Sequence, residues 1–156
     1  MTPAVRFLKS KSVQFELLEY DLGSTSNLGM AAAASMQLPE AQVFKTLVVA
    51  LDSGQLAVAI IPVAQQLNLK LLSKAAGAKN ARMADSAAAE KATGYVTGGI
   101  SPFGQKKPLP TFLATDALEF ERIYVSGGKR GLEIAVATED LIRCCPATVC
   151  KLSRGC

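Results

Sequence analysis

The chain has 156 residues, 49% of them hydrophobic, and a formal net charge of +4. This length fits one domain with a substantial buried core, and the mild positive charge is compatible with a polyanionic partner. No apolar run reaches the roughly 18 residues that a membrane-spanning helix needs. The N-terminal residues lack the basic and apolar segments of a signal peptide, so we expect a cytoplasmic protein.

The sequence contains no histidine. This excludes Ser-His-Asp and Cys-His catalysis, as well as zinc sites with a histidine ligand. Any catalysis must therefore use lysine, carboxylates, hydroxyls, backbone amides or groups that the substrate supplies. The cysteines lack the paired spacing of a zinc site, so we expect reduced thiols with no metal and no cofactor. These cysteines are Cys144, Cys145, Cys150 and Cys156.

Helical patterns and alternating apolar patterns predict an α+β fold in a single domain, with antiparallel hairpins and outer helices. Thr2 followed by Pro3 predicts an N-capped first helix, and Asn68 and Asp85 predict the caps of two later helices. In chain order we expect a helix over 2–10, a strand over 13–17, a helix over 28–36, strands over 43–51 and 56–63, helices over 69–76 and 86–92, strands over 111–115, 122–125 and 132–136, a helix beginning at 138, and a strand over 147–152.

Two glycine-containing stretches are candidates for a ligand site. Residues 97–107 hold three glycines, a proline and two adjacent lysines, and residues 126–131 have the same character. Glycine lets backbone N–H groups approach a ligand, so such loops can direct amide donors at a carbonyl or phosphate oxygen. The alternative is that both are surface connections. Neither stretch matches G-x-G-x-x-G or the P-loop, which disfavours a mononucleotide-binding fold.

Two sets of basic residues allow two interpretations each. Lys45 lies inside the apolar strand pattern over 43–51, where its ammonium could either extend to solvent at an edge or lie in a cleft and bind an anion. The cluster from Lys70 through Lys74 and Lys79 to Arg82 is either a solvated face or a nucleic-acid contact.

Four stretches together carry a family resemblance: residues 43–47, 93–102, 104–107 and 123–132. With them the chain resembles the free-standing proteins related to the editing domain of bacterial prolyl-tRNA synthetase. Within that superfamily it is similar to the Cys-tRNA(Pro) deacylases of the YbaK type. The resemblance implies a single editing domain with a mixed, largely antiparallel, partly closed barrel-like sheet and surrounding helices.

The resemblance also implies an activity, the hydrolysis of the ester between a wrongly attached cysteine and the 3′ end of tRNA(Pro). In such proteins the substrate's own thiol is thought to attack the ester carbonyl, releasing the tRNA as a thiolactone forms. The protein then needs to position the ester and stabilise its oxygen, which requires no histidine. Prolyl-tRNA synthetase is the implied partner that recognises tRNA(Pro).

By matching position, the resemblance makes Lys45 and Gly98 the expected catalytic residues, with Lys45 holding a phosphate or the ester region. Leu28 and Glu133 stand where we expect an aromatic residue and an aspartate, which leaves the preferred amino acid open. The expected substrate-binding residues are Tyr20, Leu28, Thr46, Gly99, Ile100, Ser101, Pro102, Ser126 and Glu133, and the expected tRNA contacts are Lys106, Lys107, Lys129 and Arg130.

Two other functions remain open at this point. One is the deacylation of Ala-tRNA(Pro), which needs an activated water because alanine has no thiol. The other is a non-catalytic module that binds aminoacyl-tRNA or a synthetase. The presence of Lys45 beside an intact glycine loop favours a deacylase over such a module.

Overall fold

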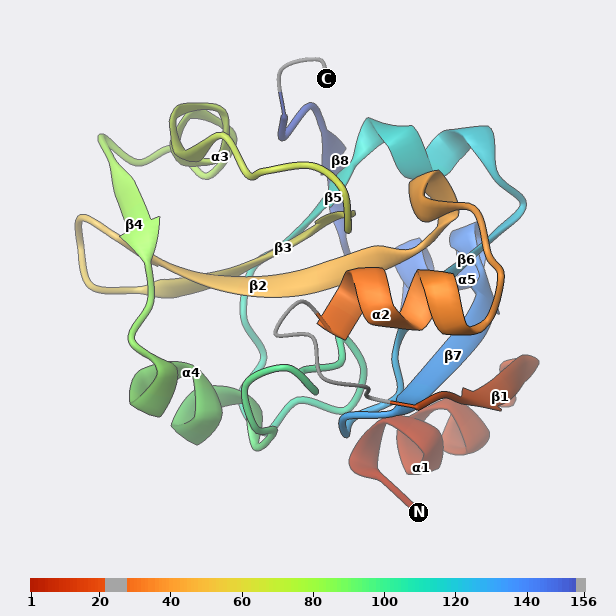
Figure 1. Ribbon diagram of the computed structural model, residues 1–156. Helices are drawn as coiled ribbons and strands as arrows, with labels where there is room; N and C mark the ends of the chain where they lie inside the picture. Colours follow the sequence, from red (N-terminus) through yellow and green to blue (C-terminus); the bar gives the residue numbers. More distant parts are fainter. Residues whose placement is uncertain (22–27, 154–156) are drawn as a thin grey trace.

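The structure is a computed structural model that describes residues 1–21 and 28–153. Five α-helices, eight strands and two short 3-10 helices make up these ranges (Figure 1). In chain order they are α1 (Pro3–Ser10), β1 (Phe15–Glu19), α2 (Leu28–Ser35), η1 (Glu40–Gln42), β2 (Phe44–Leu51), β3 (Leu56–Pro62), α3 (Leu69–Ala75), β4 (Ala81–Met83), α4 (Ser86–Thr93), β5 (Thr111–Ala114), η2 (Thr115–Glu119), β6 (Arg122–Ser126), β7 (Leu132–Ala137), α5 (Thr138–Cys144) and β8 (Thr148–Cys150).

The strands form two sheets, one of three strands in the order β1-β7-β6 and one of five in the order β4-β2-β3-β5-β8. A parallel bridge between Val43 and Tyr124 connects them. The predicted α+β class is confirmed, and the sheets do not close into a barrel. In Figure 1 the long β2–β3 hairpin crosses the middle of the molecule, with α4 and the glycine loop that follows it below the hairpin and α3 above it.

The β2–β3 hairpin is the centre of the core. Its antiparallel register pairs Phe44 with Pro62 at one end and Ala50 with Leu56 at the other. The turn at 52–54 contains Gly54 at φ +90°, and Leu51 N–H donates to Gln55 O over 2.8 Å beside it. Most residues of both strands are buried on both faces, which explains the nearly continuous apolar sequence of this region.

Two of the three predicted helix caps are confirmed. Thr2 Oγ1 accepts a hydrogen bond from Val5 N–H over 3.3 Å, and Asn68 Oδ1 accepts one from Leu71 N–H over 3.0 Å. Thr2 Oγ1 also donates to Gly127 O over 2.6 Å, which ties the first helix to the second glycine loop. Asp85 occupies the predicted N-cap position of α4, but its side chain makes no capping hydrogen bond.

The sequence patterns missed the strand β4 and the parallel pairings. β4 pairs with β2 in antiparallel register, Val49 opposite Met83, and forms an edge of the five-stranded sheet. It has three residues, one of them the exposed Arg82, too few to show an alternating pattern. β5 is parallel to both β3 and β8, because the segments that connect these strands cross over instead of forming hairpins.

Loop 97–107 packs against α1. The rings of Phe7 and Phe103 stack with centroids 6.2 Å apart, and Gly104 adopts φ +65° with its Cα facing the backbone of Pro3. Ile100 and Phe103 of this loop thereby belong to the hydrophobic core. Within residues 1–21 and 28–153, no helix is long and apolar enough to cross a membrane.

The packing of Gly104 predicts a stability difference between two glycine variants. A Cβ on Gly104 would lie 2.6 Å from Pro3 O, whereas a Cβ on Gly77, also at positive φ (+72°), would meet nothing within 4 Å. Both Gly→Ala variants share the cost of the left-handed backbone, so the difference isolates the clash. We expect Gly104→Ala to lose about 1–3 kcal/mol more than Gly77→Ala in urea unfolding. Equal losses would contradict this packing.

Candidate functional site

A cavity of about 520 Å³ opens where the first half of β2 passes above the loop that follows α4. Its volume is within the range of small-molecule sites. Its walls come from β2, the chain just after β4, the start of α4, the first glycine loop and the ends of β1, β6 and β7. Of the predicted site residues, those that line it are Tyr20, Lys45, Thr46, Gly98, Ile100, Ser126 and Glu133.

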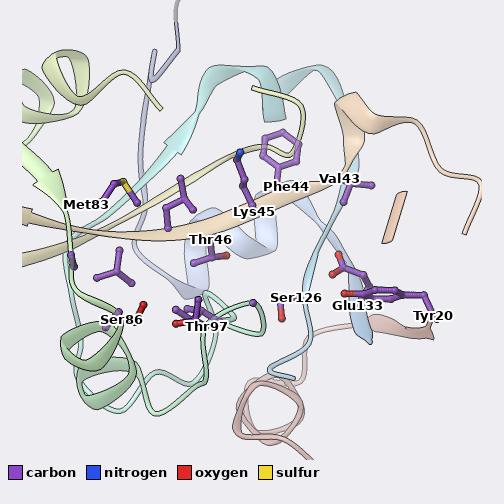
Figure 2. Close-up of a pocket in the computed structure, with 16 residues that line it drawn as sticks. Tyr20, Val43, Phe44, Lys45, Thr46, Met83, Ser86, Thr97, Ser126 and Glu133 are labelled. Atoms are coloured by element: carbon purple, nitrogen blue, oxygen red, sulfur yellow. The ribbon is translucent and has the colours of Figure 1, made fainter. Parts of the chain in front are cut away.

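The lining has two chemically different ends. Figure 2 shows Tyr20, Ser126 and Glu133 at one end and Met83 and Ser86 at the other. Thr46 points from β2 toward the glycine loop near Thr97, in the middle of the cavity. The site is therefore elongated, with a polar end and a mixed end.

Lys45 lies on β2 between the buried residues Phe44 and Thr46. Figure 2 shows its side chain extending to the side of the strand opposite Thr46, as expected for neighbouring residues of a β-strand. Its ammonium forms no ion pair with any carboxylate in the described ranges. Burial lowers the pKa of Lys45, because desolvation disfavours the charged form. A partly desolvated cation without a protein partner is suited to bind an anionic group of a ligand.

Thr46 and Glu133 place two buried polar groups at the cavity. The two residues are 9% and 5% exposed, and neither Thr46 Oγ1 nor Glu133 Oε2 has a hydrogen-bond partner in the described part of the chain. Burial raises the pKa of Glu133 to about 8. Burial also raises the pKa of the neighbouring Tyr20 phenol, with a smaller contribution from the Glu133 charge. Buried polar groups without partners indicate a place where a ligand completes the hydrogen bonding.

The first glycine loop begins with a tight turn. Gly99 N–H donates to Val96 O over 2.9 Å, and Gly98 within the turn adopts φ +90°. The Gly98 N–H, at the cavity wall, has no hydrogen-bond acceptor among the residues that the structure describes. Such a free backbone N–H can stabilise negative charge on a ligand oxygen.

The second glycine loop lies directly on this turn. A Cβ on Gly99 would be 2.8 Å from Lys129 Cα and 2.9 Å from Arg130 N, so only glycine allows the two backbones to approach this closely. The Arg130 guanidinium donates to Thr97 O from Nε over 3.0 Å and from Nη2 over 2.8 Å. The two glycine loops thus form one unit.

Three predicted substrate-binding residues of the first loop do not line the cavity. Gly99 makes the contact between the loops just described. Ser101 is fully buried, and its Oγ accepts a hydrogen bond from Phe103 N–H over 3.3 Å. Pro102 O accepts one from Cys145 Sγ over 3.3 Å. For Leu28, the structure describes the backbone as the first residue of α2, and its side chain lies outside the described part of the molecule.

The predicted tRNA contacts are exposed around the same loops. Lys106 and Lys107 use their backbone N–H groups to bond Thr93 O and Ala92 O, each over 2.9 Å, which closes the C-terminal end of α4 and leaves their ammonium groups at the surface. Lys129 is also exposed. Arg130 differs from these lysines, since its guanidinium is engaged at Thr97.

Sequence reasoning missed Met83, Ala84, Ser86 and Ala89 as cavity residues. Their position depends on β4, which the pattern did not predict. In the described ranges no group of three or more potential ligands could hold a metal ion. Cys144, Cys145 and Cys150 are free thiols, and burial raises the pKa of Cys145 to about 12, which makes this thiol a poor nucleophile.

The buried Glu133 predicts a specific pH dependence of stability. Its pKa rises from 4.5 to about 8 on folding, so its contribution is fully present below the lower value and is lost as the pH rises through the higher one. Between these values the free energy of unfolding should fall by up to about 1.4 kcal/mol per pH unit. Glu133→Gln should abolish this decline, and Glu19→Gln, at an exposed position of β1, should retain it. Urea unfolding between about pH 5 and pH 9 measures both. Parallel curves for wild type and Glu133→Gln would contradict the assignment.

Comparison with known proteins identifies the family. The sequence model of the aminoacyl-tRNA editing domain matches residues 9–144. A protein of Enterococcus faecalis that carries the provisional name Cys-tRNA(Pro)/Cys-tRNA(Cys) deacylase EbsC is 37% identical over 141 residues, which cover 90% of this chain and 86% of that protein.

Solved structures agree in fold. A crystal structure described as a candidate trans-editing enzyme for prolyl-tRNA synthetase superposes with a TM-score of 0.86 at 22% identity, covering 99% of both chains. A scaffold protein for the presentation of grafted epitopes superposes with a TM-score of 0.87 at 21% identity, covering 99% of this chain and 96% of that one. With its match over residues 9–144, the chain belongs to the aminoacyl-tRNA editing domain family.

Proposed function

We propose that this protein is a trans-editing deacylase that removes cysteine from mischarged Cys-tRNA(Pro). The observation that carries the proposal is the content of one cavity. It holds a lysine, a glycine turn with a backbone N–H and buried polar groups, all without partners among the described residues. These groups supply positioning and charge stabilisation in a chain without histidine. The name of the relative from Enterococcus faecalis agrees with this substrate.

The proposed reaction uses the thiol of the substrate. Its sulfur attacks the ester carbonyl carbon, the bond from that carbon to the ribose oxygen breaks, and the thiol proton ends on the released hydroxyl of the terminal adenosine. The product is a four-membered thiolactone, which water then hydrolyses to cysteine. The step that the protein must assist is the development of negative charge on the carbonyl oxygen.

The polar end of the cavity is the proposed aminoacyl site. Gly98 N–H is the donor to the ester oxygen, and Thr46 Oγ1 and the Glu133 carboxyl face the amino acid, where Tyr20 and Ser126 complete the wall. With its pKa near 8, Glu133 holds a proton at neutral pH and becomes a carboxylate when the substrate ammonium lies beside it. This arrangement satisfies the buried groups that lack partners in the free protein.

The position of Lys45 supports a role at the nucleotide. Its side chain leaves β2 on the side away from Thr46 and Thr97, so the ammonium is better placed for a phosphate of the terminal nucleotides than for the ester carbonyl. A flexible lysine with no ion pair pays little to move toward that phosphate. The mixed end of the cavity at Met83 and Ser86 then receives the adenosine.

The surface around the loops is the proposed acceptor-stem contact. Lys106, Lys107 and Lys129 are exposed on the two glycine loops and offer salt-sensitive contacts that carry no base specificity. Selection of tRNA(Pro) then depends on a partner, for which we propose prolyl-tRNA synthetase in the cytoplasm.

Lys45→Ala should abolish deacylation, because it removes the only cation placed at the cavity by the described residues that line it. The fold should remain intact, since the Lys45 side chain makes no ion pair in the described structure. The release of labelled cysteine from tRNA(Pro) measures the activity, with Lys9→Ala on the exposed side of α1 as the matched control. Normal turnover by Lys45→Ala would refute the assignment.

The amino-acid profile tests the substrate and the mechanism together. With tRNA(Pro) charged in turn with cysteine, alanine and proline, we expect rapid loss of cysteine alone. S-methylation of the cysteinyl group blocks the thiol and should reduce the rate by about 100-fold or more. Preferential loss of alanine would instead indicate an activated water and a pocket altered by Leu28 and Glu133. If no ester is cleaved even with the synthetase present, the protein is a binding module.

A further inference from the structure

The turn at Val96–Gly99 has one peptide unit that decides its geometry. Gly99 N–H donates to Val96 O over 2.9 Å, and Gly98, the third residue, has φ +90°. These are the features of a type II β-turn, in which the third residue has a φ of about +80°. The central peptide unit joins Thr97 C=O to Gly98 N–H, and the two groups point in opposite directions.

This peptide unit has an alternative orientation. In a type I turn the third residue has a φ of about −90°, and the conversion from type II rotates the central peptide while the rest of the turn stays in place. Glycine adopts both φ values readily, so Gly98 permits either form. A rotation would turn the Gly98 N–H away from its present side. A specific contact is therefore needed to hold one orientation.

Arg130 supplies that contact. Nε and Nη2 of its guanidinium both donate to Thr97 O, over 3.0 Å and 2.8 Å, which holds the carbonyl end of the central peptide from the second glycine loop. Glu90 Oε2 accepts a hydrogen bond from Thr97 N–H over 2.8 Å and holds the preceding peptide unit. This bond lowers the pKa of Glu90, and the nearby Arg130 charge lowers it further. Two side chains of opposite charge thus hold consecutive peptide units.

The base of Arg130 is fixed as well. Its backbone N lies against the Cα of Gly99, where a Cβ would approach to 2.9 Å. On the other side of the same loop, a Cβ on Gly128 would be 2.8 Å from Tyr95 Cε1, and Gly127 O accepts the hydrogen bond from Thr2. Packing therefore fixes the backbone that carries the Arg130 side chain, which places the guanidinium beside Thr97 O.

We infer that Arg130 is a positioning residue of the deacylase, which holds the Thr97–Gly98 peptide so that Gly98 N–H stays available to the ester oxygen. This inference deepens the proposed function and depends on it for the role of Gly98. It removes Arg130 from the set of tRNA contacts and leaves its neighbour Lys129 in that set. A cation on Thr97 O also polarises the peptide and makes Gly98 N–H a stronger donor.

Single-turnover deacylation distinguishes a residue that positions the Thr97–Gly98 peptide from one that contacts tRNA. Arg130→Ala and Lys129→Ala remove the same charge from adjacent positions. We expect Arg130→Ala to lower the rate at saturating enzyme by about 10- to 100-fold. The half-saturating enzyme concentration should change by less than about twofold. Lys129→Ala should instead raise the half-saturating enzyme concentration and change the saturated rate by less than about twofold. Arg130→Lys should restore part of the rate, because its one donor nitrogen replaces the two of the guanidinium. If Arg130→Ala instead weakens binding and leaves the saturated rate unchanged, the inference is wrong.

Amide hydrogen exchange of the free protein tests the contact between Arg130 and Thr97 O without any substrate. Thr97 and Gly99 have hydrogen-bonded N–H groups that report on the turn. Arg130→Ala should speed their exchange, while Lys129→Ala should match the wild type. Unchanged exchange in Arg130→Ala, with an unaltered melting temperature, would overturn the inference. A wild type that cleaves no ester would refute the proposed function alone, since hydrogen exchange would still show whether Arg130 holds the turn.

Discussion

The close approach of two backbones determines the geometry of this site. Gly99 lies against Lys129 and Arg130 at a distance that excludes a side chain, and Gly128 lies in the same way against Tyr95. Tyr95 in turn donates from its phenol to Phe103 O, and Thr2 donates to Gly127 O. Backbone packing is stiff because it has no rotamers to change. Packing therefore holds the backbone at Gly99, directly after Gly98 in the cavity wall.

The chemistry that such a wall supports is electrostatic. Around the cavity lie a cation with lowered pKa, a carboxyl with raised pKa and a backbone donor, and no strong nucleophile is among the residues that line it. Fixed donors of this kind lose little energy to reorganisation when charge develops on the substrate. This agrees with the family to which the chain belongs, the aminoacyl-tRNA editing domains.

Local features of the fold could be predicted from the sequence, whereas features set by distant contacts could not. Thr2 and Asn68 indicate the starts of their helices because a cap acts within four residues. The β2–β3 hairpin follows from two apolar runs with a turn sequence between them. No local sequence pattern indicates that β5 pairs in parallel with β3 and β8. Lys45 was a candidate because it lies inside an apolar strand pattern, whereas Glu133 was named only through the resemblance. The burial of Glu133 in β7 could not be predicted from a charged residue type. The contact of Arg130 with Thr97 O could not be predicted, because a basic residue in a glycine loop has the same sequence pattern whether it faces RNA or a carbonyl.

The pairing of β1 with β7 has a consequence for the order of synthesis. Tyr20, at the end of β1, and Glu133, in β7, reach the cavity from opposite ends of the chain, because Leu18 pairs with Glu133 across more than a hundred residues. On the ribosome, residues 132–137 emerge long after β1, so β1 cannot pair until β7 has been synthesised. Pairings of this sequence separation also slow folding. The polar end of the cavity is thus completed only after β7 has been synthesised and has paired with β1.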